Sequence, residues 1–415
     1  MSVVAMVPHT DRSTLRLARK AGDMTRDGRG RVAGMWPILH YGFRPFFFLA
    51  ALYAGLAIPL WLRLLFYGGA LPGPFADLQW HAHEMTFGYL GAVLAGFILT
   101  AIPNWTGRLP LSGWPLAGLV ALWIAGRLAM AFLPDPLLAM IFDLALPMVL
   151  ALTVWREVVA GRNWKNAPIA AMMTLVGIAS AFDHLGVMGV MPEGLGLRLG
   201  LAVTAMLIAL VGGRIVPSFT RNWLAKQKVD NLPSSFGRLD TVALAATAMG
   251  GLAWVAWPDS IFTGVLLIVA GVLLGARLAR WRGFATGREP IILVLHLGYA
   301  WLALALALIG AAVLVPALPP SAALHALTAG AIGTMTLAVM TRASLGHTGR
   351  PIVADGAMLA IYGLVTLGAI IRMAAPFSGG AYVMCLIVGG AIWSMAFLLF
   401  VARFTSILWG ERVRG

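Results

Sequence analysis

Twelve long apolar runs dominate the 415-residue chain, and they constrain its fold more than any single motif does. Each run is about 20 residues long, which is the length that an α-helix needs to cross the hydrocarbon core of a bilayer. Backbone polar groups find no water in lipid, so such a run is stable there only as a helix. We therefore predict an all-α membrane protein with twelve transmembrane helices, near residues 46–66, 82–102, 115–133, 136–154, 168–190, 197–216, 239–257, 261–279, 291–314, 321–341, 356–374 and 381–402.

Composition supports the membrane assignment and narrows the chemistry. Hydrophobic residues make up 60% of the chain and charged residues only 11%, whereas soluble domains are about half apolar and a quarter charged. The single cysteine, Cys385, excludes an intramolecular disulfide and any multi-cysteine zinc or iron–sulfur site. The eight histidines are therefore the main candidates for metal ligands.

The net charge of +14 could indicate a nucleic-acid partner, but the positions of the basic residues favour a topological explanation, and we expect no nucleic acid to bind. If the N-terminus is cytoplasmic and the spans alternate, all but four of the 30 Arg and Lys residues lie on the cytoplasmic side. Arg63, Arg198 and Arg372 lie on the far side, and Arg127 lies within the third span. The positive-inside rule then places both termini in the cytoplasm.

The chain begins with a basic segment that lacks the apolar core of a signal sequence. We expect residues 1–35 to form a cytoplasmic tail, either as a short amphipathic helix on an anionic membrane surface or as a disordered segment. Residues 36–415 then form one membrane domain.

Sequence repetition divides this domain into three units of four spans, near residues 40–160, 161–283 and 284–405. Proline fits the first turn of a helix, where its missing N–H is not needed. The first span of each unit opens at such a proline, namely Pro45, Pro168 and Pro290. We predict a pseudo-threefold bundle of repeated four-helix units.

A longer repeat relates the second and tenth spans. His83 and His325 stand 242 positions apart, and each is followed by glycines five and eight residues later. The middle unit has Leu197 at the corresponding position. Only the outer two units therefore carry the repeated histidine, which we expect at the same depth on two helices.

Repeat-related histidines at equal depth could ligate one iron from two sides. We therefore take His83 and His325 as candidate axial ligands of haem; two hydrogen-bonded histidines near the interface are the alternative. His81 lies two residues from His83, so on a helix it points about 160° away. We assign His81 to a second role, holding a haem propionate or a second metal, with Glu84 on its face of the helix.

Other ionisable residues inside the spans are further candidates, because such groups are costly in a bilayer. His184 follows Asp183 in the fifth span, where the pair could bind a metal, relay protons or make a structural contact. His296 in the ninth span is a weaker metal candidate, with a hydrogen-bonded core histidine as the alternative. We expect Arg127 and Asp143, on facing spans, to form a structural ion pair.

Six short motifs carry a resemblance to a known family. They are His40-Tyr41-Gly42-Phe43-Arg44-Pro45-Phe46-Phe47, Trp80-His81-Ala82-His83-Glu84-Met85, Pro103-Asn104-Trp105-Thr106-Gly107-Arg108, Asp183-His184-Leu185, His296-Leu297-Gly298-Tyr299 and His347-Thr348-Gly349-Arg350-Pro351. Through them the chain resembles the NnrS family of membrane proteins from about residue 36 to the C-terminus. The resemblance implies a haem- and copper-containing protein of the bacterial inner membrane, associated with denitrification and tolerance of nitric oxide. It also implies nitric oxide or a related small ligand, an electron donor and the lipid bilayer as partners.

A more distant similarity is to subunit I of the haem–copper oxidases and nitric oxide reductases. These proteins also have twelve spans in three units, with low-spin haem histidines on the second and tenth spans. This chain has no His-His dipeptide in its seventh span and one histidine in its tenth, so their three-histidine copper site cannot be carried over. A copper site here would need other residues, among them His81, His184 and His296.

These observations together favour a haem-binding inner-membrane protein that acts in nitric oxide metabolism or the nitrosative-stress response. With copper bound it could be a redox-active oxidoreductase acting on nitric oxide. One alternative is a transporter or metal-handling channel with histidines along the permeation path. Another is a haem-based sensor or assembly factor without turnover.

Overall fold

The structure of the protein is a computed structural model that describes residues 34–106 and 109–413. Within these residues there is no β-strand, and twelve helices are long and apolar enough to cross a membrane. The prediction of an all-helical protein with twelve membrane spans is therefore confirmed. The tail predicted at 1–35 lies almost entirely outside the described residues.

The twelve spans follow one another with short connections, and three of them contain a π-helical segment. In chain order they are α2 (Phe43–Tyr67); α3 (Asp77–His83), η2 (Glu84–Tyr89) and α4 (Leu90–Thr106); α5 (Trp114–Phe132); α6 (Pro136–Ala160); α7 (Ala167–Val187); α8 (Leu195–Leu207), η4 (Ile208–Gly212) and α9 (Gly213–Lys226); α10 (Arg238–Ala256); α11 (Ile261–Ala279); α12 (Pro290–Leu314); α13 (Pro320–His325), η6 (Ala326–Ile332) and α14 (Gly333–His347); α15 (Gly356–Ala374); and α16 (Tyr382–Trp409).

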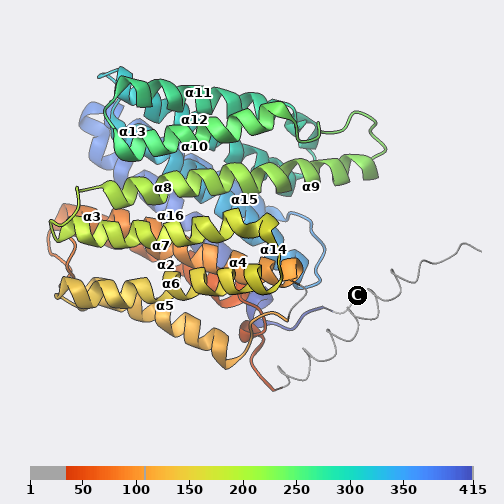
Figure 1. The fold of residues 1–415 in the computed structure, drawn as a ribbon, viewed down its shortest axis with the longest axis horizontal. Coiled ribbons are helices and arrows are strands. Elements are labelled where there is room, and N and C mark those ends of the chain that lie inside the picture. Colours follow the sequence, from red (N-terminus) through yellow and green to blue (C-terminus); the bar gives the residue numbers. More distant parts are fainter. Residues whose placement is uncertain (1–33, 107–108, 414–415) are drawn as a thin grey trace, which may run out of the picture.

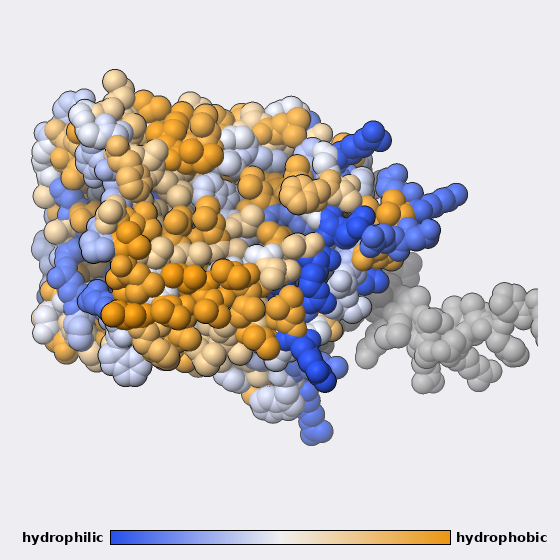
Figure 2. Space-filling view, turned by 90° about the horizontal axis from the view of Figure 1, so that it is seen from above, coloured by the Kyte–Doolittle hydropathy of each residue, from blue (hydrophilic) through white to orange (hydrophobic). Residues whose placement is uncertain are grey.

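The helices run roughly along the long axis of the molecule, so the two ends of the bundle are distinct (Figure 1). Helices α3 and α13 lie at one end, and the end of α9 and the C-terminus lie at the other (Figure 1). Hydrophobic side chains cover much of the middle of the face seen in Figure 2, and hydrophilic ones gather toward the end that bears the C-terminus. This is the surface expected of a bundle that crosses a bilayer.

The π-helical segments η2, η4 and η6 occupy the second, sixth and tenth spans. They therefore recur once in every four spans. A π turn closes an i→i+5 hydrogen bond and widens the helix locally, and such turns are frequent at functional sites. Two of these spans, the second and the tenth, are the most buried of the twelve.

A side chain from a neighbouring helix donates a hydrogen bond to a backbone carbonyl within each π segment. Widened turns leave carbonyl oxygens open to such donors. The three bonds run from Trp123 Nε1 to the Gly88 carbonyl (3.0 Å), from Arg277 Nη1 to the Ala209 carbonyl (2.8 Å) and from Trp393 Nε1 to the Ala329 carbonyl (3.1 Å). The irregular turns are thus fixed in place by tertiary contacts.

Candidate functional site

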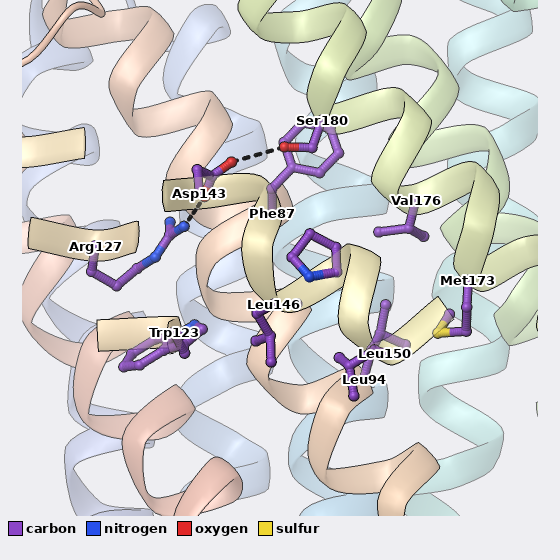
Figure 3. A pocket seen from close by; sticks show the side chains of 12 residues that line it. Phe87, Leu94, Trp123, Arg127, Asp143, Leu146, Leu150, Met173, Val176 and Ser180 are labelled. Atoms are coloured by element: carbon purple, nitrogen blue, oxygen red, sulfur yellow. Dashed lines mark hydrogen bonds and ion pairs between the residues drawn. The ribbon is translucent and has the colours of Figure 1, made fainter. Parts of the chain in front are cut away.

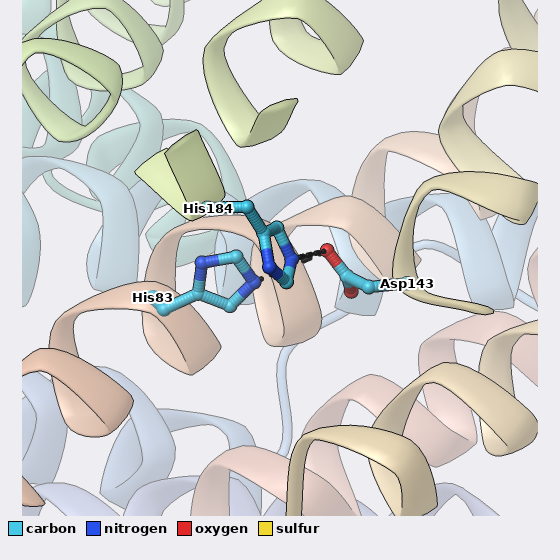
Figure 4. A group of neighbouring side chains, drawn as sticks. All are labelled: His83, Asp143 and His184. Atoms are coloured by element: carbon cyan, nitrogen blue, oxygen red, sulfur yellow. Dashed lines mark hydrogen bonds and ion pairs between the residues drawn. The ribbon is translucent and has the colours of Figure 1, made fainter. Parts of the chain in front are cut away.

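A buried cluster of His83, Asp143 and His184 lies between three spans (Figure 4). His83 is the last residue of α3, Asp143 lies in the first third of α6, and His184 lies in the last turn of α7. Both histidines are fully buried and Asp143 is 4% exposed. Each of the three side chains offers one potential ligand atom, and these atoms all lie within 4.8 Å of one another.

One carboxylate oxygen is the centre of this cluster. Asp143 Oδ2 lies 3.2 Å from His83 Nε2 and 3.1 Å from His184 Nε2. It also accepts a hydrogen bond of 2.9 Å from the Ser180 hydroxyl, one turn before His184 on α7. Two imidazole nitrogens and a carboxylate therefore converge on a single point inside the bundle.

A hydrogen bond at the edge of the cluster determines which nitrogen of His83 has a lone pair for a metal ion. His83 Nδ1 lies 2.8 Å from Asp183 Oδ2, and because a carboxylate only accepts, Nδ1 carries the proton of this bond. In the neutral imidazole, His83 Nε2 is then left as a lone pair facing Asp143. Carboxylate–histidine pairs of this kind orient metal-ligating imidazoles in many proteins.

Asp143 is held on its other oxygen by Arg127. The Arg127 guanidinium pairs with Asp143 Oδ1 and with Glu84, and Tyr53 donates a hydrogen bond to the same Glu84 carboxylate. The predicted Arg127–Asp143 pair is thus confirmed. Glu84 thus bonds to Arg127 and Tyr53, and no hydrogen bond joins it to His81 among the described residues.

The charges of this network do not balance among the residues in contact. Asp143, Asp183 and Glu84 supply three carboxylates, and Arg127 supplies one guanidinium, which leaves two negative charges if both imidazoles are neutral. A buried charge is stable only when it is paired. Either a divalent cation or two imidazolium protons would complete the network.

The ligand spacing suits a metal ion. Bonds of about 2.1 Å in a tetrahedral arrangement place ligand atoms roughly 3.4 Å apart. The two nitrogen–oxygen distances of 3.1 and 3.2 Å approach that separation. Two imidazoles and one carboxylate suit copper, zinc or iron, whereas magnesium and calcium prefer oxygen ligands.

A separate cavity of about 1010 Å³, including its opening, is lined by His81 and His325. His81 stacks on Trp61, with ring centroids 4.0 Å apart and an interplanar angle of 17°. His325 Nδ1 donates to the Ser321 carbonyl at 2.7 Å, so its Nε2 keeps a lone pair. The remaining wall is mainly apolar, and it includes one cation, Arg372.

Three polar groups that line this cavity have no hydrogen-bond partner among the described residues. They are Nη1 of Arg372, Nδ1 of His81 and Nε1 of Trp61, and all three are buried. A buried polar group without a partner is costly and needs an explanation, such as a ligand or ordered water. The cavity therefore combines a large apolar space with unsatisfied polar groups at its edge.

The structure thus separates His83 from His325 and brings His81 together with His325. His83 belongs to the cluster with Asp143 and His184, whereas His325 lines the separate cavity. A π segment directly follows each of the two histidines, six residues long in η2 and seven in η6. Equal spacing in the sequence therefore does not bring the two imidazoles into one site.

The other predicted histidines divide between these regions. His184 joins the cluster with His83, next to Asp183 as the sequence places it. His296 is 5% exposed, lies 2.8 Å from the Thr220 hydroxyl through Nε2, and lines neither the cluster nor the cavity. It is not brought together with any other predicted site histidine.

Sequence reasoning missed that Asp143 connects Arg127 to both imidazoles. A signal was present on α7, where Ser180 and His184 are four residues apart in a mostly apolar span. Residues at this spacing share one face of a helix, and polar groups on one buried face need a polar partner on a neighbouring helix. Asp143 on the adjacent α6 supplies it.

Comparison with known proteins identifies the family. A family described as NnrS protein matches residues 37–412, which is most of the chain. No curated protein matches the sequence. The chain belongs to the NnrS family and is a multi-pass membrane protein of that family, which is associated with the nitric oxide response.

Proposed function

We propose that this member of the NnrS family binds haem in the cavity between His81 and His325, binds copper at the cluster of His83, Asp143 and His184, and acts in nitric oxide metabolism or the nitrosative-stress response. The observation that carries the proposal is the pair of imidazoles on one large apolar cavity. They come from the second and tenth spans, the two that carry the repeated histidine motif.

The lining of the cavity fits haem in its chemistry. Cofactor pockets are mostly apolar, with a few polar groups that fix orientation. His325 offers Nε2, and His81 stands on the same cavity with its ring held by Trp61. The Arg372 guanidinium, whose Nη1 has no protein partner, suits a propionate, because arginine pairs well with carboxylates. Haem, when bound, supplies one-electron chemistry.

The cluster fits copper through its donor set. His83 and His184 each present Nε2 toward the Asp143 carboxylate, and a divalent ion would balance the two unmatched negative charges. The protein residues have defined tasks: Asp183 orients His83, and Arg127 orients Asp143. Copper, when bound, supplies a second redox centre.

The orientation follows from the charges. We propose that the end of the bundle that bears the C-terminus faces the cytoplasm of a bacterial inner membrane, because basic residues are concentrated there in the sequence. Both sites then lie toward the other face, since α3 and α13 begin at the opposite end (Figure 1). Nitric oxide is the proposed small ligand, and an electron donor is the proposed partner.

The bundle is proposed to be pseudo-threefold. The recurrence of a π segment in the second, sixth and tenth spans supports three four-helix units, as does the fixation of each segment by a side-chain donor. The middle unit has Leu197 where the outer units have histidine, so only the outer units contribute ligands.

The test is an optical and elemental measurement on the purified protein. We expect a haem Soret band, a reduced-minus-oxidised spectrum typical of six-coordinate haem, and copper in elemental analysis. His325→Ala should abolish the Soret band, whereas His347→Ala, at an exposed position on α14, should retain it. A colourless, metal-free protein would contradict the proposal and favour a transporter. Haem binding without any effect on nitric oxide consumption would favour a sensor or assembly factor.

A further inference from the structure

A second, narrower cavity adjoins the His83–Asp143–His184 cluster and lies among the second to fifth spans (Figure 3). Its empty volume is about 520 Å³ when the open space at its mouth is included, but only a small part of it admits molecules of water size. It is therefore too small for a cofactor. Its apolar wall includes Phe87, Leu94, Leu146, Leu150, Met173 and Val176.

The cavity is polar only where it meets the cluster. Arg127, Asp143 and Ser180 line that part, and Ser180 and Arg127 are bonded to Asp143 (Figure 3). Trp123 also lines the cavity, but its N–H is used by the Gly88 carbonyl. A single N–H, Nε of Arg127, is buried without a partner among the polar groups of this wall. The wall thus offers little to a charged or strongly hydrogen-bonding ligand.

Gly91 and Pro147 together make room in this cavity, one because it has no side chain and the other because it has no backbone N–H. Gly91 in α4 lines the cavity, and a Cβ added there would meet no atom within 4 Å. Pro147 lies inside α6, where it cannot donate a hydrogen bond to the carbonyl of Asp143 four residues earlier. The open space of the cavity and the missing hydrogen bond in α6 therefore lie side by side, next to the carboxylate of Asp143.

The cavity is close to the surface that faces lipid. Pro147 lines it and is itself partly exposed, next to the exposed Met148 and Val149 on the outer face of α6. A small apolar molecule dissolved in the bilayer could therefore approach Asp143 from the side of Pro147.

We infer that this cavity binds a small uncharged gas molecule and leads it from the bilayer to the buried cluster. The apolar wall, the lack of free polar groups other than Arg127 Nε, and the position between lipid and cluster carry the inference. The identification of that gas with nitric oxide rests on the proposed function. Dry apolar cavities in other proteins take up xenon, which provides a probe that needs no metal.

The experiment measures xenon binding by ¹²⁹Xe nuclear magnetic resonance on the full-length protein in lipid nanodiscs, with and without metal. The wild type should show a saturable xenon site. Gly91→Phe should remove it, because the new ring would fill the cavity, and Val176→Ala should strengthen it by enlarging the same space. Gly118→Phe is the matched control, since Gly118 also has open space around its Cβ position but lies on the exposed face of α5.

The outcomes separate this inference from the proposed function. Equal xenon binding in the wild type and Gly91→Phe would overturn the inference, as would ordered water filling the cavity in a high-resolution structure. Gly91→Ala adds only a methyl group and should weaken xenon binding if the larger substitution does not fold. Loss of copper and haem with xenon binding intact would contradict the proposed function and leave the cavity assignment standing.

Discussion

His81 and His83 are two residues apart on one helix, yet they lie in opposite kinds of environment. His83 has a carboxylate at each ring nitrogen, Asp183 at Nδ1 and Asp143 at Nε2. His81 stacks on Trp61 and lines a mainly apolar cavity, and its Nδ1 has no partner. The comparison teaches that one helix can present two imidazoles to different surroundings, one among carboxylates and one on a mainly apolar cavity.

The largest expected effect is that each of two substitutions removes a different cofactor. His81→Ala should remove haem and leave the cluster metal, and His83→Ala should do the reverse. Each substitution deletes a proposed ligand of one site only. Haem content from the Soret band and copper from elemental analysis would be measured on both variants. If His83→Ala lost haem while His81→Ala kept it, the pairing expected from the repeat would hold instead.

The next effect is on folding. Asp143→Asn would leave the buried Arg127 and the imidazoles short of their shared carboxylate, which typically costs about 3–5 kcal/mol for a broken buried pair. The Asp183 side chain is 13% exposed, and among the described residues its carboxylate bonds to His83 alone, so Asp183→Asn should cost less, about 1–3 kcal/mol. Thermal unfolding in detergent with a chelator present would compare them. Equal melting temperatures would show that Asp143 is not the centre of the cluster.

A smaller effect should be confined to the cavity. Arg372→Gln should weaken haem binding by about 1.5–3 kcal/mol, the range for a hydrogen bond to a charged group. Because Nη1 of Arg372 has no protein partner, the same change should not destabilise the haem-free protein. Haem titration and thermal unfolding give the two numbers. A loss of stability without a loss of haem affinity would assign Arg372 a structural role.

The smallest effect concerns the hydrogen bonds to the π segments. Trp123→Phe and Trp393→Phe each remove one N–H donor to a backbone carbonyl, at a cost of about 1 kcal/mol. Trp393 lines the haem-candidate cavity, so its substitution should also shift the Soret band, while Trp123→Phe should leave the band unchanged. Identical spectra for the two variants would argue that the cavity is not the haem site.

The positions of the spans could be predicted from the sequence, because each apolar run is about as long as a bilayer is thick. Their ends could not. The sixth span was expected near 197–216, but its helix continues to Lys226. The part of the helix beyond residue 216 contains the polar residues Ser218, Thr220 and Arg221. Because hydropathy responds only to apolar residues, it does not detect this polar part of the helix.

The candidate site was predictable in its parts and not in its assembly. The sequence indicated His83, the Asp183–His184 pair and the Arg127–Asp143 pair as separate features. Their convergence depends on tertiary packing of α3, α6 and α7. The π segments were not predicted, because composition does not distinguish an i→i+5 hydrogen bond from an i→i+4 bond.

The spacing of His81 and His83 also bears on how a membrane voltage would act on charge that moves between the cavity and the cluster. Two residues rise only about 3 Å along a helix, so the cavity and the cluster lie at nearly the same depth. A charge that crosses the whole membrane gains or loses about 2.3 kcal/mol per 100 mV. Charge that moves between these two regions instead travels parallel to the membrane plane. The membrane potential therefore favours neither region over the other.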